Sequence, residues 1–349
     1  MNFKIYFYTI ILCNLLLLIQ FTEIYSNKPR CGAPYSLRTC ANNDTDCGVW
    51  ENRWWEPHNC TFHNITAESA RKCLGNRTLA FVGDSQIRDL GMGVALFLMG
   101  EELDQAPDHK VDKRMEMLMT NASIVGQYQH WEVNAAWNAL VYPKQNSTTR
   151  KPIEAQHEWQ IQVWMLYSNT HIDRQVDDVI TNNLKNKTSG LDNPLLHDVD
   201  LLFWSYGLHD WGWWDTPPFG QKYYDCFVRR WKEIRQLPNA APSVLVSLNP
   251  ECVEKFPWAE HSNGILNSDR FHTQAAMAED ANYFVNARMK LENLPYWDAG
   301  APLRSPYRCN VSDDGLHVKM FVDIMRAKML FHHLCTKDMT WKGTLDSFL

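Results

Sequence analysis

One stretch of the chain reads Thr78-Leu79-Ala80-Phe81-Val82-Gly83-Asp84-Ser85, a short apolar run that closes on a glycine and two polar residues. Residues 86–99 follow it with a composition that favours a helix. A strand, a tight turn and a helix in this order indicate a unit of parallel α/β structure. Ser85 is therefore predicted to lie at the carboxyl end of a core strand and at the start of a helix.

The same alternation recurs along the chain. Strands are predicted at 157–167, 199–205 and 243–248, and helices at 223–237, 271–291 and 318–334, the last as a strongly amphipathic helix. Residues 101–156 are polar and unpatterned, and we interpret them as a long excursion. The pattern predicts a three-layer αβα sandwich around a central, mostly parallel sheet, with ligands at the carboxyl ends of the strands.

The bulk composition limits the classes of function. The 349 residues are 45% hydrophobic and 21% charged, with a net charge of −6. A nucleic-acid-binding protein needs a basic surface, so the net negative charge predicts that this protein does not bind nucleic acid. No cluster of cysteine and histidine has convincing metal-ligand spacing, so neither a metal nor an organic cofactor is expected for hydrolysis.

The N-terminus predicts entry into the secretory pathway. Lys4 precedes an apolar stretch at 5–21, which suits a cleaved signal peptide or an uncleaved type II anchor, and the nearly balanced charges on its two flanks indicate no orientation. We therefore divide the chain into a signal or anchor at 1–26, an irregular segment rich in cysteine and tryptophan at 27–76, and a catalytic domain at 77–349. The only membrane contact expected is through the N-terminal segment, and the mature protein is placed outside the cell or in the Golgi lumen.

Sequons and cysteines support the same compartment. Eight N-x-[ST] triplets occur, at Asn43, Asn59, Asn64, Asn76, Asn121, Asn146, Asn186 and Asn310. Asn76 directly precedes the first core strand, so we expect it to be too buried for modification. Five cysteines fall within residues 31–73, a density typical of disulfides that tie down a loop-rich segment.

Three residues predict nucleophilic chemistry. A serine at a helix N-terminus has backbone N–H groups and the helix dipole available to favour an oxyanion. Asp314 and His317 are three residues apart near the end of the chain, so the carboxylate can orient the imidazole and leave its other nitrogen free for Ser85. Taken alone, the Gly83-Asp84-Ser85 motif and the Asp314 and His317 pair each have a structural interpretation, since Asp84 and Asp314 also suit helix caps.

The motifs resemble the SGNH or GDSL hydrolase superfamily. Its nearest branch is the PC-esterase group, with the trichome-birefringence-like polysaccharide O-acetyltransferases and the luminal domain of sialic-acid O-acetyltransferases. The likeness covers most of residues 48–335 and rests on four blocks: Trp55-Glu56-Pro57-His58-Asn59-Cys60, Phe81-Val82-Gly83-Asp84-Ser85-Gln86-Ile87-Arg88, Gly207-Leu208-His209-Asp210-Trp211 and Asp314-Gly315-Leu316-His317.

The resemblance implies a role for each motif residue. Ser85 would be the nucleophile, His317 the general base and Asp314 the orienting carboxylate. The backbone of Gly207 would complete the oxyanion hole, while His209 stands where the superfamily has an asparagine. Arg88 would bind a carboxylate or a substrate oxygen, or else form a structural ion pair.

The same resemblance implies an esterase or acyltransferase that acts on O-acyl, above all O-acetyl, groups of glycans. Acetyl-CoA or another acetyl donor is implied if the enzyme transfers, and the sequence does not separate transfer from hydrolysis. Two tryptophan clusters, 50/54/55 and 211/213/214, either belong to the core or, at the second cluster, form a sugar-stacking platform. A catalytically silent glycan-binding or adhesion protein and a lipid esterase are the alternative functions.

Overall fold

The computed structural model describes residues 48–58, 60–62, 64–100, 106, 125–130, 135–141, 160–166, 199–205, 219–236, 240–250, 252, 255, 268–304, 308–312, 314–336, 338–343 and 345–349. The predicted signal or anchor at 1–26 lies outside these ranges. Among the described residues, no helix combines the length and the apolar composition needed to cross a bilayer.

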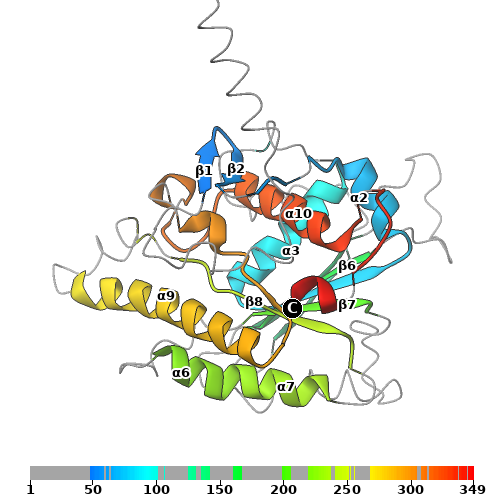
Figure 1. Cartoon of the computed structure of the whole chain (residues 1–349). Helices are drawn as coiled ribbons and strands as arrows, with labels where there is room; N and C mark the ends of the chain where they lie inside the picture. Colours follow the sequence, from blue (N-terminus) through cyan, green and yellow to red (C-terminus); the bar gives the residue numbers. More distant parts are fainter. Residues whose placement is uncertain are drawn as a thin grey trace, which may run out of the picture.

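A seven-stranded sheet forms the centre of the molecule, in the order β4-β5-β6-β3-β7-β8-β9 (Figure 1). The strands are β3 (Thr78–Gly83), β4 (Val125–His130), β5 (Ala135–Val141), β6 (Gln160–Leu166), β7 (Leu201–Ser205), β8 (Ser243–Val246) and β9 (Tyr296–Trp297). β3 pairs in parallel with β6 on one side and β7 on the other, and the parallel pairing continues through β8 to β9. Every residue of β3 is buried, as expected for a strand covered on both faces.

Helices cover both faces of this sheet. On one face pack α3 (Ser85–Leu98) and α10 (Met320–Leu334). On the other lie α6 (Phe219–Tyr223), the short π-helix η3 (Tyr224–Val228), α7 (Arg229–Arg235) and α9 (Ser268–Leu291) (Figure 1). Alternate side chains of β3 divide between the two layers: Leu79 and Phe81 join the α3 and α10 side, and Ala80 and Val82 the α9 side. The predicted mixed α/β architecture, a parallel sheet flanked by helices, is confirmed.

α3 and α10 approach each other closely because α3 carries glycine at the contact. A Cβ atom on Gly93 would lie 2.3 Å from the Cβ atom of Asp323 in α10. The helix predicted at 318–334 is present, but every residue of α10 is buried, so the amphipathic character expected of it does not correspond to an exposed face. Its outer side is covered by the N-terminal segment, where Trp50 packs edge-on against Phe321.

The interpretation of residues 27–76 as irregular is wrong for its described part. β1 (Gly48–Glu51) and β2 (Trp54–Pro57) form an antiparallel hairpin, and α2 (Ala67–Leu74) follows it. A capping box between Thr66 and Ser69 begins α2, with serine in the place where glutamate or glutamine is usual. A disulfide from Cys73 to Cys335 ties α2 to the end of α10.

The interpretation of residues 101–156 as a patternless excursion is also wrong in its described part, because β4 and β5 lie there. β5 pairs antiparallel with β6 and β4 with β5, so together they extend the sheet at its edge. β4 is mostly polar (VGQYQH), whereas β5 is mostly apolar (AAWNALV) and pairs on both of its edges, with β4 and with β6. Short 3₁₀ turns complete the described chain: η5 (Ala301–Leu303), η6 (Arg308–Val311) and η7 (Leu345–Phe348).

Candidate active site

Ser85 lies where β3 turns into α3. Gly83 makes this turn possible, since a Cβ atom there would lie 1.8 Å from the backbone oxygen of Ser205. Asp84 is the N-cap of α3 and its Oδ1 accepts a hydrogen bond of 2.9 Å from the backbone N–H of Gln86. Ser85 thus occupies the first helical position, at the carboxyl end of a central strand.

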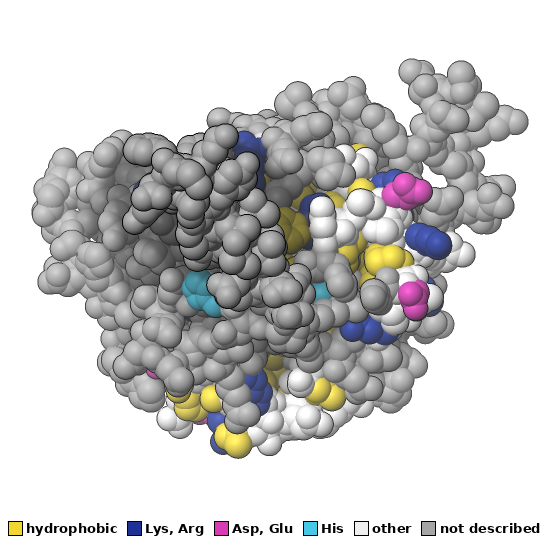
Figure 2. Space-filling model, turned by 45° about the horizontal axis from the view of Figure 1, so that its top comes forward, with side chains coloured by type: hydrophobic (Ala, Val, Ile, Leu, Met, Phe, Trp, Pro, Cys, Tyr) yellow, Lys and Arg dark blue, Asp and Glu magenta, His cyan; other side chains and the backbone are white. Residues whose placement is uncertain are grey.

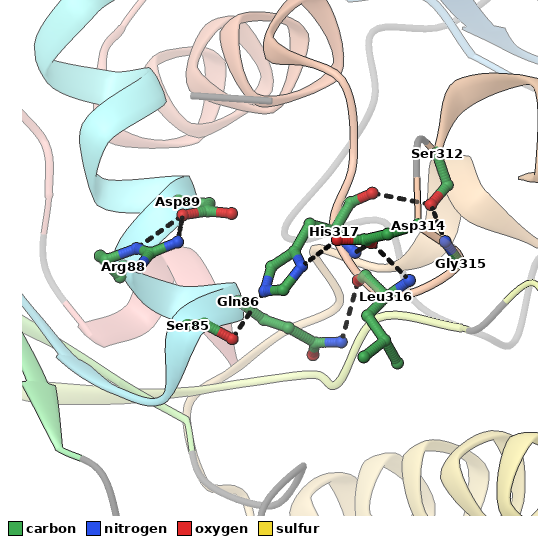
Figure 3. A network of polar contacts seen from close by, with 9 residues as sticks. All are labelled: Ser85, Gln86, Arg88, Asp89, Ser312, Asp314, Gly315, Leu316 and His317. Atoms are coloured by element: carbon green, nitrogen blue, oxygen red, sulfur yellow. Dashed lines mark hydrogen bonds and ion pairs between the residues drawn. The ribbon is translucent and has the colours of Figure 1, made fainter. Parts of the chain in front are cut away.

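His317 and Asp314 meet Ser85 from the other end of the chain. The Nε2 atom of His317 lies 2.8 Å from the Oγ atom of Ser85, and its Nδ1 atom lies 2.8 Å from Oδ2 of Asp314 (Figure 3). A neutral imidazole that donates from Nδ1 to the carboxylate has Nε2 free to accept from the serine hydroxyl. The structure therefore brings together all three residues singled out from the sequence, in the order serine, histidine, aspartate.

The loop that carries them, residues 312–317 without the undescribed position 313, is called the His317 loop below. Oδ1 of Asp314 accepts from the backbone N–H groups of Leu316 and His317, at 3.0 and 2.8 Å. The Oγ atom of Ser312 donates to the His317 carbonyl at 2.7 Å and accepts from the Gly315 N–H at 2.9 Å. One carboxylate oxygen thus shapes the loop, while the other orients the imidazole.

A second segment braces this loop from outside. Cys252 forms a disulfide with Cys309, and its backbone N–H donates to the Gly315 carbonyl at 2.9 Å. The Nζ atom of Lys255 donates to the carbonyl of Ser312 at 2.7 Å. The disulfide therefore holds the segment that precedes the His317 loop, and the hydrogen bonds hold the loop itself.

Arg88 forms an ion pair with Asp89. It lies one turn after Ser85 on α3, with a side chain 16% exposed, and both its Nε and Nη2 atoms contact Oδ1 of Asp89, at 2.8 and 2.6 Å (Figure 3). Of the two roles considered for Arg88, the described contacts are those of a structural ion pair.

An unforeseen carboxyl group lies behind the site. Asp323 is fully buried on α10, 3.3 Å from the Nη2 atom of Arg326. Burial raises its pKa to about 7; Asp89 adds to this, while Arg326, His317 and Arg88 act in the opposite direction. An acidic and a basic residue three positions apart in a helix, such as Asp323 and Arg326, usually form a pair on the solvent face, so the sequence does not indicate that Asp323 is buried.

Other residues singled out from the sequence give a mixed result. Trp55 is fully buried, and Trp50 and Trp54 pack against the same core, so the first tryptophan cluster is structural. Gly207, His209 and the second tryptophan cluster lie outside the described residues. Within the described ranges, no group of three or more His, Cys, Asp or Glu residues is arranged to hold a metal ion.

The fold and the site together define an α/β protein with a Ser–His–Asp constellation at the carboxyl end of a central parallel strand. Compared with protein-family models, the sequence matches none. The assignment of a function therefore rests on the motifs and the geometry.

Proposed function

We propose that the protein is a serine-dependent O-acyl esterase or acyltransferase of the SGNH type that works through an acyl-enzyme. The observation that carries the proposal is the unbroken hydrogen-bonded chain from Ser85 Oγ through His317 to Asp314, with 2.8 Å at both links. A nucleophile, a base within hydrogen-bond reach and a third group that orients the base are the parts that acyl transfer requires.

In the first half of the proposed reaction, the Oγ atom of Ser85 attacks the acyl carbonyl carbon and its proton passes to Nε2 of His317. The C=O double bond becomes an oxyanion, which the N–H of Ser85 and the positive end of α3 would stabilise. The N–H of Gln86 is already donated to Asp84, so this neighbour is not the second donor. The backbone of Gly207 is the proposed second donor, by resemblance.

Collapse of this intermediate breaks the bond to the leaving alcohol, which takes the proton from His317 as it departs. The acyl group then remains esterified to Ser85. A water molecule or a sugar hydroxyl gives its proton to His317 and attacks the acyl carbon. Collapse of this second intermediate breaks the bond between the acyl carbon and Oγ of Ser85, which takes the proton back from His317, and the acyl group leaves as the acid or as the new ester. Throughout both halves, Asp314 keeps Nδ1 protonated and stabilises the imidazolium, without itself taking up the proton.

We propose O-acetylated glycans as the substrate class, on the resemblance to the PC-esterase branch alone. On the face turned forward in Figure 2, basic, acidic and hydrophobic side chains of the described residues are interspersed. Side chains of both charge signs are present among the described residues of that face, so their charge gives no preference between substrates. An acetyl donor such as acetyl-CoA enters only if the enzyme transfers.

The described disulfides indicate an oxidising compartment, and within it we propose the Golgi lumen or the cell exterior. Asn64, Asn76 and Asn310 are exposed sequon asparagines, so the expectation that Asn76 is too buried is wrong. Each should carry an N-linked glycan when the chain is made in a secretory host. Replacing one of them by glutamine should remove one glycosidase-sensitive step in gel mobility; an unchanged pattern for all three would contradict this placement.

The functional test compares wild type with Ser85→Ala, each made in a secretory host. Wild type should release acetate from p-nitrophenyl acetate and from an O-acetylated glycan, and the variant should release none above background. Addition of a non-acetylated glycan then separates transfer from hydrolysis. Equal, background rates for two well-folded proteins would contradict the proposal and favour a silent glycan-binding protein, whereas activity on long-chain lipid esters alone would favour a lipid esterase.

A further inference from the structure

Both peptide groups that flank the Cα atom of His317 are held by hydrogen bonds. The peptide between Leu316 and His317 is fixed at its two poles: its N–H donates to Oδ1 of Asp314 at 2.8 Å, and its carbonyl accepts from Nε2 of Gln86 at 3.4 Å (Figure 3). The carbonyl of His317 itself accepts from Oγ of Ser312 at 2.7 Å. The imidazole direction therefore depends on these partners as well as on Asp314 Oδ2.

Gln86 differs from the other partners because it does not belong to the His317 loop. It follows Ser85 directly on α3, and its side chain reaches across to a segment 230 residues away. Its amide is nearly buried, with 5% of the residue exposed, and its Oε1 atom accepts from the backbone N–H of Asn249 at 3.0 Å. A buried amide with both ends bonded has one favourable orientation, since turning it over would leave a donor facing a donor.

The support for Gln86 is itself fixed from two helices. Asn282 of α9 bonds both backbone groups of Leu248, accepting from the N–H at 2.8 Å and donating to the carbonyl at 2.9 Å. The buried Arg326 of α10 donates from Nη1 to Oδ1 of Asn249 at 2.9 Å. Hydrogen bonds from helices on both faces of the sheet thus fix Leu248 and Asn249, which follow β8. Gln86 is bonded to Asn249 at one end of its amide and to the peptide before His317 at the other.

We infer that Gln86 is a positioning residue, which sets the separation between Ser85 Oγ and His317 Nε2. This inference rests on the proposed function. Gln86 contacts neither reacting atom. It is the residue after the nucleophile Ser85, and its side chain is hydrogen-bonded to the peptide that precedes the base His317. Proton transfer between the two is sensitive to their separation, because a displacement of about 1 Å can lower the rate by about 10²-fold.

Two variants separate the bonds of Gln86. Gln86→Met keeps the length of the side chain and removes both bonds. Gln86→Glu keeps an acceptor for Asn249 and removes the donor to Leu316. Because the bond to Leu316 is the one that positions the loop, both variants should lower kcat by about 10- to 100-fold with little change in KM. Val285→Ala, a core truncation under the opposite face of the sheet, should lower the melting temperature without lowering kcat.

Amide hydrogen exchange gives a second readout that needs no catalysis. The amides of Leu316 and His317 should exchange about five- to tenfold faster in both Gln86 variants than in wild type, and unchanged in Val285→Ala. If wild type proves inactive, the proposed function fails, and the exchange rates still decide the role of Gln86. Exchange rates of these amides that are unchanged in the Gln86 variants overturn the inference. If wild type is active, a kcat that is not lowered by Gln86→Met overturns it too, and so does a kcat that falls in Gln86→Met but not in Gln86→Glu.

Discussion

Replacing Asp323 by asparagine should flatten the pH dependence of folding stability. In the folded protein this carboxyl group is fully buried between α3 and α10 and has a pKa of about 7, against an ordinary value of 3.8. The folded state therefore holds a proton that the unfolded chain has already released above about pH 5. A raised carboxyl pKa makes the protein most stable on the acid side, and this stability is lost as the pH rises through 7.

The size of the effect follows from the two pKa values. From about pH 5 to near pH 7 the folded carboxyl holds about one proton more than the unfolded one, and by about pH 8 both are deprotonated. At about 1.4 kcal/mol per proton and pH unit, the free energy of unfolding should fall by about 2 to 3 kcal/mol over that interval because of Asp323 alone. Asparagine has no proton to lose, so Asp323→Asn should lack this component.

Urea denaturation at several pH values between 5 and 8 measures the slope directly. Groups that do not interact with Asp323 contribute to wild type and variant alike, so the difference between the two curves reports Asp323 together with its coupling to the charged groups around it. If the curves of wild type and Asp323→Asn ran parallel, the argument that burial keeps a proton on Asp323 would be refuted.

Three further outcomes test the site and its surroundings. Asp314→Asn should lower kcat by about 10³- to 10⁴-fold on p-nitrophenyl acetate, since the amide favours the wrong imidazole tautomer. Removing the Cys252–Cys309 disulfide by two alanines frees a loop of sequence separation 57, which should cost about 4 kcal/mol in urea denaturation and also lower kcat. Gly93→Ala places a methyl group 2.3 Å from the Cβ atom of Asp323, which should cost about 1 to 3 kcal/mol of stability by thermal melting.

Each of these outcomes has its own control. Asp314→Asn should melt within a few degrees of wild type, and a near-normal kcat would remove Asp314 from the site. Alanines at the Cys73–Cys335 disulfide, which anchors α2, should lower stability without a matching loss of kcat below the melting transition. Equal losses of kcat from the two disulfides would argue against a specific brace, and an unchanged melting point for Gly93→Ala would argue against the close helix contact.

The local signals were sufficient for much of the fold and for the three site residues. β3, Gly83 and the cap at Asp84 are decided by neighbours in sequence, so a strand, turn and helix could be predicted there. The spacing of Asp314 and His317 likewise sets their mutual contact within one loop. The loop that carries them follows η6 and not a strand of the sheet, so its approach to Ser85 is a tertiary contact that the spacing does not predict.

The remaining features depend on partners far along the chain. Gln86 has no pattern that separates it from any polar residue in the first turn of a helix, and its role comes from Asn249 and Leu316. Asp323 resembles a solvent-facing residue, because sequence alone does not show that other segments cover all sides of α10. At the edge of the sheet, β4 is mostly polar (VGQYQH), so its local composition does not indicate a strand, and pairing with β5 supplies what that composition lacks.

The central claim is that Ser85 is a nucleophile activated by His317, and covalent trapping measures this most directly. Purified protein is treated with a fluorophosphonate and the modified peptide is identified by mass spectrometry. The account predicts one modification, on Ser85 of wild type, absent in Ser85→Ala and at least about 10³-fold slower in His317→Ala. No modification of folded wild type, or a modification that persists in Ser85→Ala, would contradict it.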